Sequence, residues 1–209
     1  MEEDMDAQQW YHLIKKEESD PYEKLHTLGA IRYDFFGVDE YELRRGNKVK
    51  EWHPDSWLAS DCPANDGEPF DFLHNCLGLP VVSPRLRSVL ESEVLQEGEV
   101  QFLPVSLFRS TGEKIDGFSI MNVLRPVEAL DRQHCRELME DPEKIDPATG
   151  KPKVRGVGVY AVFAAAVAGR SIVRLKEFRP PILVSERFVA AFKRNKFLGG
   201  YFPKVIVTP

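Results

Sequence analysis

The feature that most constrains this chain is an internal repeat. VVSPRLRSVLES at 81–92 is followed by FLPV at 102–105, and LVSERFVAAFKR at 183–194 is followed by YFPKV at 201–205. Each copy has the pattern of an apolar strand, a serine cap, a helix with arginine at its second position, and a strand containing an aromatic residue and proline. The two Val-Ser-x-Arg cores lie 102 residues apart. Two copies are too few for a solenoid, so the repeat predicts two similar strand-helix-strand units within one α+β fold.

The rest of the chain predicts a mixed, mainly antiparallel sheet with a few short helices. Strands are expected at 9–14, 100–108 and 118–124, and Pro104 indicates an edge position or a bulge. Ser83 before Pro84 predicts a helix over 84–93, and Phe188, Val189 and Phe192 predict the buried stripe of a second helix. The remaining expectations are a long surface loop over 53–71, a helical turn over 127–130, a turn-rich loop over 141–153, and a strand pair of 157–167 with 171–175 that turns at Ala168-Gly169.

Composition excludes several classes of protein. Of the 209 residues 43% are hydrophobic and 29% charged, which is ordinary for a globular protein and excludes a disordered chain. No apolar run reaches the ~18 residues of a membrane-spanning helix. The acidic start, MEEDMD, lacks the pattern of a signal peptide. Three cysteines (Cys62, Cys76 and Cys135) are too few and too odd in number for a disulfide scaffold. We therefore expect a cytoplasmic protein with no membrane partner.

Charge is distributed unevenly along the chain. Residues 1–104 carry a net charge of −12 and residues 105–209 a net charge of +7. The asymmetry has two interpretations: a dipole that steers a charged partner, or charges that interleave on the folded surface and cancel. Under the first, the single domain of residues 1–209 has an acidic lobe (1–110) and a basic lobe (111–209). The overall charge of −5 argues against direct binding of nucleic acid.

Motifs for chemistry are incomplete. His53, Cys62, His74 and Cys76 are candidate zinc ligands, but they lack C-x2-C or H-x3-H spacing. His134 and Cys135 are sequence neighbours without the third, orienting group that nucleophilic catalysis needs. No phosphate-binding or dinucleotide-binding glycine motif is complete. We expect no catalytic residue, metal or cofactor. A small metal-dependent hydrolase that uses His53, His74 and nearby acids is the alternative, and a regulatory or scaffold domain is a third reading.

Three strings in this order resemble one bacterial immunity-protein family over roughly residues 30–207. They are PVVSPRLRSVLES with VQFLPVSL, then GFSIMNVLRPVEALD, then PPILVSERFVAAF with GGYFPKV. The best markers are Val-Ser-x-Arg at 82–85, Asn122-Val123 with Asp131 downstream, and Val-Ser-Glu-Arg at 184–187. Members are small cytosolic proteins encoded beside polymorphic or contact-delivered toxins. The resemblance implies a protein without catalytic activity that binds one cognate toxin and blocks it. It also implies structural roles, with Ser83 and Ser185 as helix caps and Arg85 and Arg187 as packing or ion-pair residues.

The expected partner is therefore a toxin or effector protein, and its binding site is expected among acidic and aromatic residues. The candidates are Asp34, Phe35, Phe36, Asp39, Glu40 and Tyr41 in one segment, and Asp61, Asp66, Glu68 and Asp71 in the loop. Interfaces draw most of their affinity from a few such anchors, while charge speeds the encounter. On charge alone, an acidic face suits the basic active site of a nuclease toxin.

Overall fold

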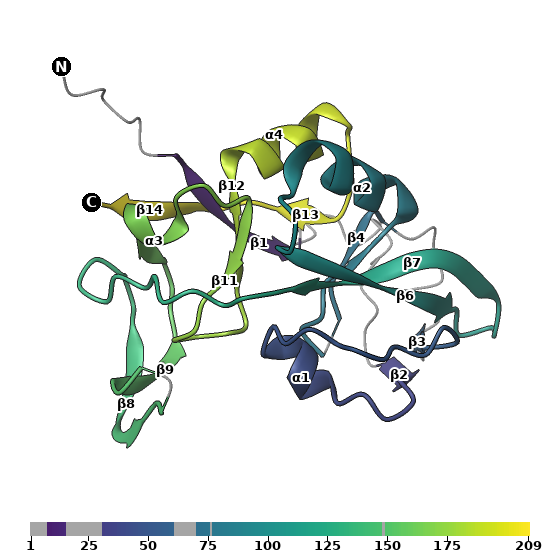
Figure 1. Ribbon diagram of the computed structural model, residues 1–209, viewed down its shortest axis with the longest axis horizontal. Helices are drawn as coiled ribbons and strands as arrows, with labels where there is room; N and C mark the ends of the chain where they lie inside the picture. The colour runs from purple at the N-terminus through teal and green to yellow at the C-terminus, as the bar shows by residue number, and fades with distance from the viewer. Residues whose placement is uncertain (1–7, 16–30, 61–69, 76, 148) are drawn as a thin grey trace.

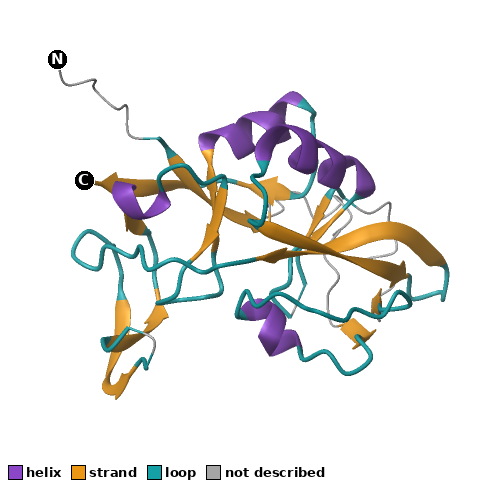
Figure 2. Cartoon of the chain, viewed as in Figure 1, coloured by secondary structure: helices purple, strands orange, loops and turns teal. Residues whose placement is uncertain are grey.

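The computed structural model describes residues 8–15, 31–60, 70–75, 77–147 and 149–209. Short helices alternate with mostly antiparallel strands, so the predicted α+β class is confirmed (Figures 1 and 2). The described strands form two six-stranded sheets and a separate hairpin.

The first sheet is built from the first half of the chain. Its strands, in order across the sheet, are β2 (Ile31–Asp34), β3 (Trp57–Ser60), β6 (Val100–Phe108), β7 (Lys114–Val123), β5 (Val81–Val82) and β4 (Phe72–Leu73). Pro104 lies before Ser106, where β6 begins to pair with β3, and next to a register shift between Val105 and Leu107. Of the two alternatives that the proline indicated, the bulge is present, whereas β6 itself lies inside the sheet between β3 and β7.

The second sheet combines the two ends of the chain. Its strands, in order, are β10 (Ala161–Phe163), β14 (Lys204–Thr208), β1 (Trp10–Lys15), β12 (Ile182–Ser185) and β11 (Ile172–Arg174), with β13 (Gly200–Tyr201) paired to β1. The predicted strand at 9–14 is confirmed as β1, which lies between β12 and β14.

Both sheets follow one pairing pattern. In the first, β3 runs parallel to β6, and β6, β7, β5 and β4 then pair antiparallel in that order. In the second, β10 runs parallel to β14, and β14, β1, β12 and β11 pair antiparallel in the same way. The strand that corresponds to β7 is β1, which comes from the opposite end of the chain. The sequence repeat is thus a repeat of sheet topology, and its second copy is closed by the N-terminal strand.

Each copy carries one helix, and the two helices pack side by side (Figure 1). Helix α2 (Pro84–Val89) continues as the π-helical turn η2 (Leu90–Val94), and α4 spans Glu186–Arg194. The backbone N–H groups of Leu86 and Phe188 donate to the hydroxyls of Ser83 and Ser185, at 3.1 and 3.4 Å, so both predicted caps are confirmed. The buried faces of both helices and both sheets share one core, which includes Leu86, Leu90, Met121, Val123, Val184, Phe188, Val189 and Phe192.

Two predicted loops contain strands. The segment 53–71 includes β3, which takes a place inside the first sheet. The segment 141–153 forms much of a hairpin of β8 (Met139–Ile145) with β9 (Pro152–Gly156). Pro142 and Pro152 lie within the strands of this hairpin, and only Pro147 and Gly150 fall in the turn between them, which is why the sequence overstated the loop.

Two other predictions are wrong for a different reason. Residues 127–130 are extended, because Val127 and Leu130 form bridges with Leu175 and Val162. The segments 157–167 and 171–175 do not pair with each other, because β10 pairs with β14 and β11 with β12, and α3 (Ala164–Val167) lies between them. In each case an apolar segment found its partner far away in the sequence.

Candidate partner interface

The segment 33–41 joins β2 to a helix that the sequence did not predict, α1 (Glu40–Arg44). The Asp34 carboxylate accepts a hydrogen bond from Phe36 N at 2.7 Å, and Asp39 caps α1 by accepting from Tyr41 N at 2.8 Å. Phe36 has a φ of +50°, in the left-handed region, and the hydrogen bond that its N–H donates to Asp34 supports this backbone conformation. The segment is fixed by its own side chains.

Three aromatic rings are exposed on this segment. Tyr33, Phe36 and Tyr41 are 37%, 47% and 56% exposed. Phe36 stacks on His53 with 3.9 Å between ring centroids, and the Arg44 guanidinium lies 4.5 Å from the centre of the Tyr41 ring. We call the exposed residues Tyr33, Asp34, Phe36, Asp39 and Tyr41, together with the partly exposed Glu40, the 33–41 surface. Burial, then the charge of Glu40 and a hydrogen bond with its carboxylate, raise the pKa of Tyr33.

The charge of this surface is smaller than the sequence suggested. Glu40 pairs with Arg44 at 3.7 Å, and neighbouring Glu42 pairs with Arg45. Asp34 and Asp39 have no basic partner among the described residues, and these two carry the surface's uncompensated negative charge. Asp61, Asp66 and Glu68 lie outside the described residues.

Two predicted interface residues need correction, because both are buried within the protein. Phe35 is 2% exposed and belongs to the core beneath the first sheet, with Leu43 and Leu58. Asp71 is 8% exposed and is occupied by internal hydrogen bonds. Neither side chain is available to a partner.

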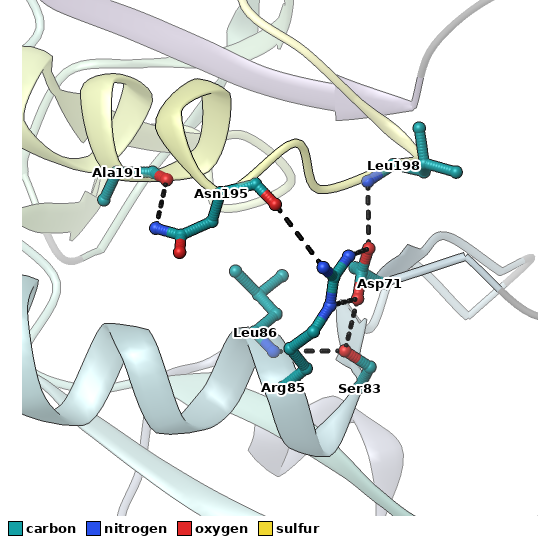
Figure 3. A network of polar contacts seen from close by, with 7 residues as sticks. All are labelled: Asp71, Ser83, Arg85, Leu86, Ala191, Asn195 and Leu198. Carbon is teal, nitrogen blue, oxygen red and sulfur yellow. Dashed lines mark hydrogen bonds and ion pairs between the residues drawn. The ribbon is translucent and has the colours of Figure 1, made fainter.

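Asp71 is the centre of a junction between the two units (Figure 3). Its carboxylate accepts from Ser83 Oγ at 2.8 Å, from Arg85 Nη2 at 2.8 Å, and from Leu198 N at 3.1 Å. Arg85 also reaches Asn195 O at 3.4 Å, beyond the end of α4. The ion-pair role expected for Arg85 is therefore observed.

The chain after α4 approaches this junction very closely. Phe72 N donates to Leu198 O at 3.0 Å. Gly199 follows with a φ of +101°, and a Cβ on it would lie 2.0 Å from Phe72 O. Only glycine fits there.

The second unit makes a corresponding junction with different chemistry. Ser185 N donates to Ser171 O at 2.9 Å, as Ser83 N does to Asp71 O at 2.8 Å, so Ser171 occupies the place of Asp71. The Ser171 hydroxyl donates to Val94 O at 2.6 Å, and Ser171 N donates to the buried Glu99 carboxylate at 2.7 Å. Arg187 is exposed and forms no ion pair with any described residue, so the ion-pair role observed for Arg85 is not repeated in the second unit.

Comparison with known families assigns the chain to one family. The model of the Immunity protein family (Imm11) matches residues 20–207. The chain belongs to this family. No protein with a curated description matches it. Membership in Imm11 supports an immunity role and a toxin as the general kind of partner, and it suggests that the protein is not a catalyst.

A pocket with a mixed polar and apolar lining lies where β14 meets the chain before the β8–β9 hairpin. It has a volume of about 390 Å³ and includes Asp131, His134, Phe163 and Thr208 in its lining. His134 Nδ1 lies 2.7 Å from Asp131 Oδ2, and Thr208 Oγ1 donates to the same oxygen at 2.8 Å. Burial alone would raise the pKa of Asp131, but the hydrogen bonds from Thr208, His134 and Gln133 N lower it overall. Asp131 thus ties β14 to the chain before the hairpin.

The thiol beside this pocket does not complete a catalytic pair. Cys135 Sγ accepts from Ala161 N at 3.3 Å, and burial raises the pKa of the thiol. His134 is engaged by Asp131 instead. Within the described residues, no group of three or more His, Cys, Asp or Glu side chains is placed to hold a metal ion, and Cys62 and Cys76 lie outside them. Over the same residues, no helix has both the length and the apolar character needed to cross a membrane.

Proposed function

We infer that this protein binds one cognate toxin or effector in the bacterial cytoplasm and neutralises it, with the 33–41 surface as its contact. Membership in the immunity family supports the class of function. The observation that carries the choice of surface is the exposure of Tyr33, Phe36 and Tyr41 on one short segment. Aromatic side chains of this kind dominate the energetics of protein interfaces.

The build of the segment favours tight binding. Asp34 and Asp39 hold the backbone on either side of Phe36 before any partner arrives. A surface that is already ordered loses less conformational entropy on association, so more of its contact energy appears as affinity. The two carboxylates also give the surface a negative charge, which suits a toxin with a basic active site such as a nuclease.

The test is co-expression with the product of the toxin gene beside this one, followed by co-purification and a growth assay. We expect a stable complex and rescue of growth. Tyr41→Ala and Phe36→Ala should each raise the dissociation constant by about 30-fold or more, as hot-spot truncations do. Tyr201→Ala is the matched control, because Tyr201 is 52% exposed on β13 and outside the surface.

Charge substitution separates steering from contact. Asp39→Lys and Glu40→Lys should slow association and flatten its dependence on salt, with a smaller effect on dissociation. An unchanged association rate would show that the charge of this surface does not steer the partner. An equal loss of affinity in Tyr201→Ala and Tyr41→Ala would show that the contact lies elsewhere.

A further inference from the structure

Arg174 on β11 is the most deeply buried charged residue in the described part of the chain. It is 1% exposed, although arginine is almost never fully buried unless it is paired. Its Nη1 donates to Arg179 O at 2.6 Å. Its Nε and Nη2 are buried without a hydrogen-bond partner among the described residues, and no described carboxylate pairs with it.

The chain brings two further arginines to the same place. Val127 N donates to Arg174 O at 2.9 Å, so β11 lies against the segment around Pro126. The chain just after α1 also packs on that segment, since a Cβ on Gly46 would lie 3.0 Å from the Pro126 ring. Arg44, in the last turn of α1, also has a buried Nε without a partner.

The charge near Arg174 is therefore positive. Burial, with the charges of Arg179 and Arg44, lowers the pKa of Arg174 to about 10, which leaves the guanidinium protonated at neutral pH. A buried charge without a counter-ion is strongly unfavourable, and unsatisfied N–H donors add to the cost. A group of this kind needs an anion that can accept from several N–H donors.

We propose that Arg174, with Arg44 and Arg179, forms a binding site for an oxyanion, either a carboxylate or a phosphate. The planar fork of a guanidinium presents parallel N–H groups that match the oxygens of both. Arg174 supplies two free donors at the base of the site, and Arg44 supplies one. Arg44 is 33% exposed and Arg179 is partly exposed, whereas Arg174 is closed off from solvent, so an anion would have to reach Arg174 past these two side chains. The site does not depend on the proposed function, because it is defined by this chain alone.

The test is a titration of the purified full-length chain with inorganic phosphate and, separately, with acetate, against sodium chloride at equal ionic strength. We expect saturable shifts of the Arg174 Nε–H resonance with a dissociation constant of about a millimolar or tighter. The melting temperature should rise over the same range of concentration. Tighter binding of phosphate would indicate a free phosphate as the natural occupant, and tighter binding of acetate would indicate a carboxylate side chain.

Variants show whether Arg174 is responsible. Arg174→Met should abolish the saturable effect while keeping the fold at least as stable without anion, because an unpaired buried charge is replaced by an apolar side chain of similar length. Arg44→Gln, at the rim, should weaken binding about tenfold or more and tests the site even if Arg174→Met folds poorly. Arg187→Met removes an exposed arginine of α4 and should change nothing. Phosphate also stabilises proteins by exclusion from their surfaces, so the same response in Arg174→Met and Arg187→Met would overturn the proposal. An unshifted Arg174 resonance in the unaltered protein would also overturn it.

Discussion

The two strand-helix-strand units share a backbone plan but differ in the polar groups at their junctions. Both have a serine-capped helix, and both anchor that serine's N–H on the carbonyl of the residue before an edge strand. In the first unit that residue is Asp71, paired with Arg85; in the second it is Ser171, and Arg187 points to solvent. The difference follows from what each residue meets in the other unit. Asp71 meets the N–H of Leu198, whereas Ser171 meets the carbonyl of Val94.

The central strands of the two sheets differ in a similar way. Val81 pairs with Ile120 of β7, and the corresponding Leu183 pairs with His12 of β1. Ile120 is fully buried, whereas the ring of His12 packs edge-to-face on Tyr160 at 4.8 Å. Burial and the nearby charge of His74 lower the pKa of His12 to about 4. One sheet therefore has a titratable group where the other has a hydrocarbon.

Replacing the junction residue should give the largest difference in stability between the two units. Asp71→Ala leaves the donors of Ser83, Arg85 and Leu198 without their acceptor, and we expect a loss of about 3 kcal/mol in the free energy of unfolding. Ser171→Ala loses one hydroxyl hydrogen bond and should cost about 1 kcal/mol. Urea denaturation of both variants checks the ratio. Equal losses would mean that the two junctions are energetically equivalent despite their chemistry.

Lowering the pH should destabilise the second sheet, which contains His12, more than the first. The folded pKa of His12 lies below its unfolded value of 6.5, so the unfolded state binds the proton more readily. Stability from this group is complete above pH 6.5 and is lost as the pH falls towards 4, by about 3 kcal/mol at most. His12→Ile, which copies Ile120, should remove that part of the pH dependence. Denaturation at pH 7, 5 and 4 provides the test, and parallel profiles for the two proteins would contradict it.

Replacing Arg85 or Arg187, which hold corresponding positions in the two units, tests a smaller difference in stability. Arg85 holds Asp71 and lies over the Phe197 ring at 4.7 Å, but its side chain is largely exposed, so solvent screens the ion pair. Arg85→Met should lower the free energy of unfolding by about 1 kcal/mol. Arg187→Met should change it by less than about 0.5 kcal/mol. A comparable loss in both variants, measured by thermal denaturation, would restore the symmetric role that the sequence repeat implied.

The helix caps should show the least difference of all. Ser83→Ala and Ser185→Ala each remove one cap, and each should cost about 1 kcal/mol. Because Ser83 also donates to Asp71, its replacement should cost slightly more. Hydrogen exchange of the first turn of each helix measures the two losses separately. A silent Ser185→Ala would show that packing alone fixes the start of α4.

The parts of the fold that sequence predicted well are those with local causes. Ser83 with Pro84, and the stripe of Phe188 and Phe192, are decided within one helical turn. The failures have distant causes. Val162 lies in β10 because Val207 of β14 pairs with it, and no local pattern contains that information.

The same division holds for the candidate site. The segment that carries Phe36 and Tyr41 is a candidate on composition, since clusters of aromatic and acidic residues stand out in a sequence, and both rings are exposed. The sequence did not predict which of these residues are accessible, because Phe35 is buried next to an exposed Phe36. Asp71 looked like a loop acid, and its pairing with Arg85 depends on how the two units meet. Arg174 gave no indication in the sequence at all, since an arginine in a strand shows its burial only after the sheet is assembled.

The position of β1 has a consequence for biosynthesis. This strand leaves the ribosome well before its neighbours β12 and β14, which begin at residues 182 and 204. At about 5–20 residues per second, roughly ten to forty seconds of translation separate the strand from its partners. The first sheet has all of its strands by Val123 and is free to form on the nascent chain, while β1 waits. The last sheet to close is thus the one that joins both ends, and a ribosome that stalls before β14 releases a chain whose second unit lacks that strand.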